Sequence, residues 1–378
     1  MALYLDYNAS APVRKEVLDA MIYAYTNVIG NANSRTHIFG DNAQKYVKTC
    51  RSQIASVLGI NPSELIFTSG STESNNMAVF GIAKWAIANN KKHIITTSIE
   101  HKAILEPLHR LEGDGFQVDY VNPDENGRVN VEEILSLVSN KTALVSVMYV
   151  NSETGIIQPV QEIGEALRQR NVYFHIDATQ ALGKLNEEIR HTAYDMMSLS
   201  AHKIGGPQGI GAFVLKWWDR DDGSPPPIEP LMLGGPQERG YRPGTTPVAL
   251  IGGFAEAVKL SDRQHDEWTQ RCKAIKDQFM QAIAGMDYRI NGAPEYCLPT
   301  TINISFTGLD AENAFLCLGD NYAFSNGSAC NSSKHKSSYV LKAMGLDEKR
   351  CAEAIRLSWD GSTKVDFGPF VQVIKSIL

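Results

Sequence analysis

The sequence predicts an α/β protein with a mostly parallel central sheet, helices on both faces, and a smaller α+β domain after it. Short apolar runs typical of buried strands alternate with helical patterns over most of the chain. Polar residues follow several of these runs directly, where parallel strands would end. From about residue 256 the alternation gives way to a polar helix and a different order of elements.

Length and composition exclude several classes of protein. The 378 residues are 43% apolar and 21% charged, which is typical of a globular chain long enough for more than one core. The net charge of -6 gives no overall positive field, so direct nucleic-acid binding is not expected. The first residues lack the features of a signal peptide, and no apolar run is long enough to span a membrane.

The six cysteines are far apart, with no CxxC pair and no metal-ligand spacing. In a long chain without a signal peptide, this pattern indicates reduced thiols. We therefore expect no metal site and a cytoplasmic location.

The first elements follow from periodicity. Residues 3–6 read as a short strand, and apolar residues recur every four positions from Pro12 to Tyr25, which predicts a helix. A second helix is expected from about Asp41 to Leu58, ending at Gly59. We expect residues 1–15 to join the small domain, 16–255 to form the large domain, and 256–378 to form the small one.

A strand, a turn of small residues and a helix come next. The strand Glu64–Thr68 leads into Ser69–Asn76 and then into the apolar run Met77–Ile87. A hydroxyl residue at the start, Ser71 or Thr72, with Glu73 in the first turn is a helix-cap signature. Such a helix start suits a phosphate, although a cap with no ligand is the commoner case.

Polar residues follow the ends of the next predicted strands, and these ends lie at one edge of the predicted sheet. The strands are expected at His93–Ser98, Gln117–Val121, Ala143–Val150, Val172–Ile176, Asp195–Leu199 and Gly211–Leu215, with helices at Val131–Val138 (capped by Asn130) and about Val160–Gln169 between them. Ligands bind beyond the carboxyl ends of parallel strands. The polar residues at those ends are Thr72, His101, Asn151, Asp177, Gln180, Ser200, His202 and Lys203.

The C-terminal part has its own pattern. A helix is expected to begin near Val248, and a polar helix is expected from about Ala255 to Ala284. The strand Thr301–Phe306 and the helix Ala311–Leu318 follow. This order favours a second, smaller α+β unit.

Lys203 stands in an unusual setting. It follows a predicted strand, is preceded by Ser200 and His202, and is followed by glycines. A partly desolvated lysine has a lowered pKa and can act as an amine nucleophile, whereas an ordinary loop lysine would reach into water. Together with Asp177, His101 and the helix start, Lys203 supplies what pyridoxal phosphate requires, namely an amine, a carboxylate for the ring nitrogen, a flat side chain and a phosphate site.

The chain resembles the cysteine desulfurases of the class-V aminotransferase group, within the fold-type I pyridoxal phosphate enzymes. The resemblance runs from Leu5-Asp6-Tyr7 to Arg356-Leu357-Ser358. It is carried by Thr68-Ser69-Gly70-Ser71-Thr72-Glu73-Ser74-Asn75, Glu100-His101-Lys102, Val150-Asn151, His175-Ile176-Asp177-Ala178-Thr179-Gln180, Ser200-Ala201-His202-Lys203 and Gly327-Ser328-Ala329-Cys330.

This resemblance implies a role for each matching residue. Lys203 would be the Schiff-base lysine, Asp177 would face the pyridine nitrogen, Gln180 would contact the ring hydroxyl, and His101 would stack on the ring and move protons. Ser71, Thr72, Ser200 and His202 would hold the phosphate, while Thr245 would reach the phosphate of a partner subunit, which requires a homodimer. Asn151 and Arg356 would bind the substrate carboxylate, although Arg356 could instead form a buried ion pair.

Cys330 lies in a stretch of small polar residues without periodicity, which is typical of a loop. The resemblance implies that its thiolate takes sulfur from L-cysteine, releases L-alanine and passes a persulfide to an acceptor protein. The nearby Lys334, His335 and Lys336 favour a thiolate. The other five cysteines are interpreted as structural, with Cys50, Cys317 and Cys351 in predicted helices.

Several details resemble the desulfurases of bacterial DNA phosphorothioation systems. They include Gly30-Asn31-Ala32, with no proline after Gly-Asn, and Pro243 before Gly244-Thr245. The acceptor could be an iron–sulfur scaffold, a tRNA-modifying enzyme or a DNA-modification protein. The alternative functions are a selenocysteine lyase, an aminotransferase on the same fold, and a non-catalytic scaffold for sulfur-transfer partners.

Overall fold

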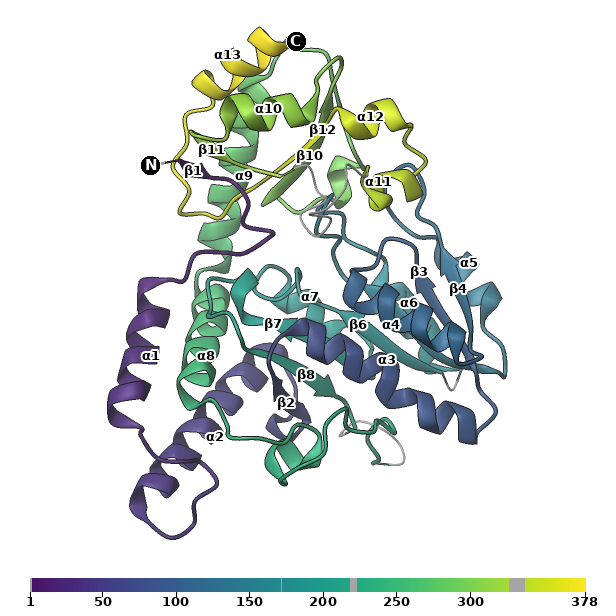
Figure 1. The fold of residues 1–378 in the computed structure, drawn as a ribbon, viewed down its shortest axis with the longest axis vertical. Coiled ribbons are helices and arrows are strands. Elements are labelled where there is room, and N and C mark those ends of the chain that lie inside the picture. Colours follow the sequence, from purple (N-terminus) through teal and green to yellow (C-terminus); the bar gives the residue numbers. More distant parts are fainter. Residues whose placement is uncertain (1, 171, 218–222, 326–336) are drawn as a thin grey trace.

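A seven-stranded sheet forms the centre of the larger part of the molecule (Figure 1). The computed structural model describes residues 2–170, 172–217, 223–325 and 337–378. The strand order is β2-β8-β7-β6-β5-β3-β4, and among these strands only β8 runs against the others. The strands are β2 (Leu65–Thr68), β3 (His93–Thr97), β4 (Gln117–Val121), β5 (Thr142–Met148), β6 (Tyr173–Asp177), β7 (Met196–Ser200) and β8 (Gly211–Leu215). The predicted mostly parallel sheet is confirmed.

Successive side chains along the strands feed two separate apolar cores, one on each face of the sheet. Met196 packs in the core beneath α3 (Ser71–Ala88) and α4 (Lys102–Gly113). Its neighbour Met197 packs in the opposite core, which α2 (Ile38–Leu58), α6 (Val160–Arg168) and α8 (Val248–Arg263) cover. Because side chains alternate across a strand, a sheet covered on both faces needs apolar residues at nearly every position. Helices therefore cover both faces, as expected.

The remaining helices of the large part are α1 (Lys15–Asn27), α5 (Val131–Leu137) and α7 (Asn186–His191). The Asn130 side chain caps α5 by accepting from the backbone N–H of Glu133, as predicted. Gly59 ends α2 at φ +65°, a left-handed conformation that favours glycine. The helix expected from Pro12 begins only at Lys15, because Arg14 is extended and its N–H donates to the carbonyl of Gly205.

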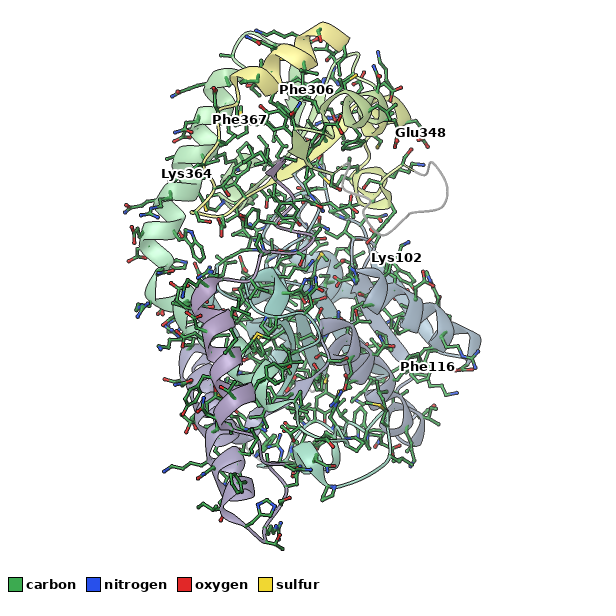
Figure 2. All side chains as sticks on the ribbon, turned by 60° about the vertical axis from the view of Figure 1, so that its left-hand side comes forward. Lys102, Phe116, Phe306, Glu348, Lys364 and Phe367 are labelled. Atoms are coloured by element: carbon green, nitrogen blue, oxygen red, sulfur yellow. The ribbon has the colours of Figure 1, made fainter. Side chains whose placement is uncertain are left out.

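A smaller part packs at one end of the sheet (Figure 1). Its antiparallel sheet has the order β12 (Ala354–Ser358), β10 (Thr301–Phe306) and β9 (Tyr288–Ile290). A second sheet pairs β1 (Leu3–Tyr4) with β11 (Tyr322–Ala323) in parallel. The helices are α9 (His265–Ala282), α10 (Ala311–Leu318), α11 (Tyr339–Ala343), α12 (Glu348–Ala352) and α13 (Gly368–Ile377). Phe306 and Phe367 belong to this part's own core, above Lys102 and Phe116 in Figure 2.

The N-terminal segment belongs to this second core by its packing. Leu5 is fully buried among residues of α9, β10 and β12. The single polar helix expected from about Ala255 to Ala284 is instead two helices that meet at Gln264. The proposed domain limit at residue 255 lies inside α8, whose side chains pack on the large sheet as far as Leu260. We keep the three-part division of the chain as a proposal.

Candidate active site

A cavity of about 400 Å³ lies at the carboxyl ends of the parallel strands, between the two parts of the molecule. Lys102, one of its lining residues, lies between them in Figure 2. The sequence-predicted residues that line this cavity are Ser71, Thr72, His101, Asp177, Gln180, His202, Lys203 and Arg356. Residues from five strand ends and from the N-terminal segment therefore meet at one place.

Lys203 closes a short 3-10 turn, Ala201–Lys203, directly after β7. Its Nζ donates to the carbonyls of Asn8 and Ala9 at 2.6 and 2.7 Å. Gly205 follows at φ +75°, and a Cβ there would lie 2.8 Å from Cγ of Arg14. The glycine permits both the turn and the close approach of the N-terminal segment. The amine is thus held in the cavity rather than extended into solvent.

Asp177 ends β6 and is 5% exposed. Its Oδ2 accepts from Nδ2 of Asn75 at 2.7 Å, and its Oδ1 accepts from the backbone and hydroxyl of Thr179. These three donors fix the carboxylate at the base of the cavity. A buried carboxylate with a fixed direction is suited to hold the protonated nitrogen of a ring.

His101 is the N-cap of α4, where the backbone N–H of Ala103 donates to its Nδ1 at 3.1 Å. In the neutral imidazole the hydrogen therefore resides on Nε2. The ring lines the cavity, so this nitrogen is available for proton transfer there.

Two further histidines are kept neutral by their surroundings. Burial, and then the charge of Lys203, lower the pKa of His202 to about 4. Burial lowers the pKa of His175 to about 4, and this ring lies between the hydroxyls of Ser146 and Ser198, 2.9 Å from each. At neutral pH both rings act through hydrogen bonds and not through charge.

The start of α3 differs from the prediction. Gly70 is the N-cap and no side chain caps the helix, so the expected Ser or Thr cap is wrong. The helix begins one residue earlier than a Ser71 cap requires, and Glu73 reaches back to accept from the backbone N–H of Ser69 at 2.7 Å. Ser71 and Thr72 consequently lie in the first turn, where both line the cavity beside free backbone N–H groups.

Arg356 lies on β12, in the second part of the molecule, and its side chain is 3% exposed. Its guanidinium pairs with Asp6 and donates to the carbonyl of Ser152 at 3.1 Å. Its buried Nε has no hydrogen-bond partner among the described residues. The arginine therefore forms the buried ion pair considered as the alternative and also lines the cavity.

Asn151 and Ser200 are buried but are not among the described residues that line the cavity. The Oδ1 of Asn151 accepts from the backbone of Glu153 and Thr154, which shapes the loop after β5. Thr245 is exposed on the segment before α8 and does not line this cavity either. Cys330 lies outside the described residues.

Sequence reasoning missed two buried glutamates near the cavity. Glu153 lines it, accepts from the hydroxyl of Ser338, and has its pKa raised to about 7 by burial. Glu100 precedes His101, and burial raises its pKa to about 8. The only signal in the sequence is a glutamate within a polar run after an apolar strand, which is typical of many exposed loops.

Lys184 was also missed. Its Nζ donates to Oε1 of Gln180 at 2.7 Å, while Nε2 of Gln180 donates to the carbonyl of Asn8 at 2.9 Å. A lysine four positions after Gln180 ordinarily indicates an exposed position, so its half-buried placement and its contact with Gln180 could not be predicted from the pattern.

The described cysteines are free thiols. Burial raises the pKa of Cys50 to about 11 and that of Cys272 to about 12, which makes both unreactive. Cys50, Cys317 and Cys351 lie in α2, α10 and α12, as predicted, but Cys317 is exposed. No helix of the described residues is long and apolar enough to cross a membrane.

The fold and the cavity define a pyridoxal phosphate-dependent enzyme of fold type I. A caged lysine, a buried carboxylate and a helix start open to the same cavity, so the donor set fits this cofactor. A family model described as aminotransferase class-V matches residues 3–358, and the chain belongs to that family. Its cofactor is pyridoxal phosphate.

Individual relatives agree with this assignment. The chain is 37% identical to the cysteine desulfurase IscS of Neisseria meningitidis serogroup C, over 99% of this chain and 91% of that protein. A solved structure titled NifS-like protein is 34% identical with a TM-score of 0.89, covering 100% of this chain and 98% of that one. The structure of DndA from Streptomyces lividans is 40% identical with a TM-score of 0.82, covering 93% and 98%.

Proposed function

We propose that this chain is a cysteine desulfurase, which converts L-cysteine to L-alanine and carries the sulfur as a persulfide on Cys330. The observation that carries the proposal is the meeting of Lys203, Asp177, His101 and Arg356 at one cavity. The names of the relatives support the same activity. The sulfur is then passed to an acceptor protein.

Different residues of the cavity would hold different parts of the cofactor. Lys203 would bind its aldehyde carbon, Asp177 its ring nitrogen and Gln180 its ring hydroxyl. Ser71, Thr72, Ser200 and His202 would hold the phosphate, with Thr245 contributed by a partner subunit. Bound pyridoxal phosphate supplies an electron sink that weakens the bonds at Cα and Cβ of an amino acid.

Substrate binding falls mainly to Arg356. Its Nε–H is buried without an acceptor among the described residues, and a carboxylate supplies an acceptor for a guanidinium. The ion pair with Asp6 holds the guanidinium in place. Asn151 stays a predicted contact of the same carboxylate; its Oδ1 accepts within its own loop and its Nδ2 donates to the carbonyl of Ile99.

Proton transfer falls to Lys203 and His101. The Lys203 amine, held by two carbonyls, can take the Cα proton once the substrate has displaced it. His101 lines the cavity, and its Nε2, the nitrogen not used by the cap, can exchange a proton with the substrate thiol. The neutral His202 adds no positive charge that would compete with these transfers.

Sulfur transfer is assigned to Cys330. Its thiolate forms a bond to the substrate sulfur, whose bond to Cβ breaks. The carbon keeps the electron pair and takes up a proton, which yields alanine. A persulfide remains on Cys330.

The described residues on either side of positions 326–336 support this assignment. Ser325 forms a β-bridge with Arg356, and the hydroxyl of Ser338 donates to Glu153. Arg356 and Glu153 both line the cavity. The described residues Ser325 and Ser338, which flank these positions in the sequence, therefore lie next to residues of the proposed active site.

Replacing Cys330 by Ser tests the proposal. We expect the variant to keep its yellow cofactor absorbance and to lose at least about 100-fold in alanine formation, because an activated nucleophile is removed. The measurement is alanine release from L-cysteine, with mass spectrometry for one added sulfur atom on Cys330. Cys317→Ser is the matched control, since that thiol is exposed on α10. Normal turnover by Cys330→Ser would refute the assignment.

The same assay separates the alternatives. A selenocysteine lyase would release alanine from L-selenocysteine but leave L-cysteine intact. An aminotransferase would consume a keto acid, for which no thiol nucleophile is needed. A non-catalytic scaffold would bind the cofactor and produce no alanine from either substrate.

For the acceptor, we propose a protein of DNA phosphorothioate modification in preference to an iron–sulfur scaffold. The likeness to DndA supports this choice, together with Pro243 and the absence of proline after Gly30-Asn31. Transfer of radiolabelled sulfur from Cys330 to purified candidates of both kinds would distinguish them. We also propose a reducing compartment, the cytoplasm, because the described cysteines are free thiols.

We further propose that the chain acts as a homodimer. The apolar residues exposed on α1, on the start of α2 and between these helices are Ile22, Tyr23, Tyr25, Ile29, Ile38 and Phe39, each more than half exposed. A concentration of large apolar side chains is typical of an interface. Helix α8 packs against α1 and α2, and Thr245 lies three positions before the start of α8. Thr245 is therefore close to the proposed interface, as its predicted contact across the dimer requires.

A further inference from the structure

Lys184 is a half-buried lysine that lies behind the active site. It lies in the turn between β6 and α7 and lines a second cavity of about 260 Å³, which shares Asn8 and Lys203 with the first. Lys184 forms no ion pair with a carboxylate among the described residues, and its nearest polar contact is Gln180. A cation in this position must act through that contact.

The contact dictates how the Gln180 amide is turned. An ammonium group can only donate, so it must face the amide oxygen of Gln180 and not the amide nitrogen. The NH2 group is thereby directed to the opposite side, where Nε2 donates to the carbonyl of Asn8. The same carbonyl accepts from Lys203, so the three side chains form one chain of hydrogen bonds, Lys184–Gln180–Asn8–Lys203.

We propose that Lys184 is a positioning residue, which acts on the reaction by keeping the amide NH2 of Gln180 toward the cofactor. The inference rests on the proposed function, since Gln180 matters to the reaction only if the cofactor ring hydroxyl lies beside it. The NH2 group has two hydrogens, and the Asn8 carbonyl takes one of them. The amide oxygen, if it faced the cavity instead, would repel an ionised hydroxyl.

The electrostatic surroundings restrict this role to the protonated form of Lys184. Burial and then the charge of Lys203 lower the pKa of Lys184 to about 7, while Cys272 acts in the opposite direction. The other charged or titratable groups around this cavity include Arg14, Glu188, His265 and Asp360. The charge of Lys203 therefore acts on Lys184 across the short distance between the two side chains.

The test compares two substitutions by the absorbance of the bound cofactor as a function of pH. A donor at the ring hydroxyl stabilises its ionised form and lowers the pH at which the absorbance changes. Lys184→Met removes the donor, so we expect this midpoint to rise by about one pH unit. Lys184→Arg keeps a group that only donates, so its midpoint should stay close to that of the parent.

A second pair of variants tests the route through Gln180. In a Gln180→Ala background, Lys184→Met should shift the absorbance midpoint by less than about a third of the shift it causes in the parent. The reason is that the effects of coupled residues are not additive. An undiminished shift would mean that the Lys184 charge acts directly, and equal shifts for Met and Arg would mean that packing alone matters. Either result, or no shift in Lys184→Met, overturns the proposal.

Lys184→Gln replaces the Met variant if that protein does not accumulate, since a neutral amide also ends the donor-only contact. The titration uses holoenzyme without L-cysteine and does not involve Cys330. A parent enzyme that binds the cofactor but forms no alanine would therefore refute the desulfurase function while leaving the titration interpretable.

Discussion

At the scale of single residues, two buried carboxyl groups near the cavity, Glu100 and Glu153, have raised pKa values. Glu100 is fully buried, its Oε1 accepts from the hydroxyl of Thr97 and the N–H of Met148, and its Oε2 has no partner among the described residues. Burial raises its pKa from 4.5 to about 8, so the group is neutral at pH 7. Burial also raises the pKa of Glu153.

Glu100 makes stability depend on pH in a definite direction. Because its pKa is higher in the folded protein than in the unfolded chain, the folded state holds the proton more tightly. The stabilisation is complete below about pH 4.5 and is lost as the pH rises toward 8. A shift of this size corresponds to on the order of 4 kcal/mol of unfolding free energy.

We predict that Glu100→Gln weakens this dependence. Between about pH 5 and pH 8, the free energy of unfolding of the holoenzyme should fall in the parent. In the variant this fall should be smaller by several kcal/mol. Denaturant unfolding at a series of pH values measures the difference. Glu165→Gln, at an exposed position, is the control and should follow the parent. Parallel curves for Glu100→Gln and the parent would contradict the prediction.

At the scale of elements, the start of α3 is built by a side chain from its own first turn. Glu73 accepts from the backbone of Ser69 and pairs with Arg242, with the Arg242 Nε 3.3 Å from its Oε1. These contacts connect the turn before α3 with the segment that leads to Thr245. The proposed phosphate site therefore depends on a residue that does not itself line the cavity.

Glu73→Ala should loosen this helix start. We expect a loss of about 1–2 kcal/mol in unfolding free energy, comparable to removing a helix cap, together with weaker cofactor binding. Glu73→Gln keeps an oxygen that can accept from Ser69 and should lose less. Cofactor release is measured by absorbance after dialysis. It should be greatest in Glu73→Ala, smaller in Glu73→Gln and smallest in the parent. Equal cofactor retention in all three proteins would show that the phosphate site does not depend on Glu73.

The central strands were predictable because each has apolar residues at nearly every position, and the strand limits at Gly211–Leu215 and Thr301–Phe306 agree with the structure. The lining residues of the cavity were predictable in part because strand ends meet at one edge. Elements such as α7, β9 and β11 were missed, since a helix of six residues and strands of three and two residues show no clear period of their type. Lys184 and Glu100 were missed because their burial depends on distant segments.

At the scale of the whole molecule, the N-terminal residues connect the two parts. β1 pairs with β11, Asp6 pairs with Arg356 of β12, and the carbonyls of Asn8 and Ala9 hold Lys203. Arg14 stacks on Trp268 of α9 at 3.3 Å from the ring centre. Lys203, the proposed Schiff-base lysine, is therefore positioned by a segment that belongs to the other core.

The exposed apolar surface of α1 and α2 leads to a prediction about assembly. Phe39→Glu should place a charge in the proposed interface and shift the protein from dimer toward monomer in sedimentation velocity. Cofactor retention should fall with it, because Thr245 would no longer reach a partner. Leu316→Glu is the control, since that side chain is 84% exposed on α10. A dimer that survives Phe39→Glu with full cofactor content would place the interface elsewhere.

The contacts of the N-terminal segment also impose an order on biosynthesis. Asp6 and Arg356 are 350 positions apart, so the first residues leave the ribosome long before their partner strand exists. The carbonyl cage around Lys203 needs less of the chain, because Lys203 follows Asn8 and Ala9 by 195 and 194 positions. A polypeptide that ends before Ala354 therefore lacks the ion pair that holds Arg356 at the cavity, even where Lys203 is already held by its carbonyls.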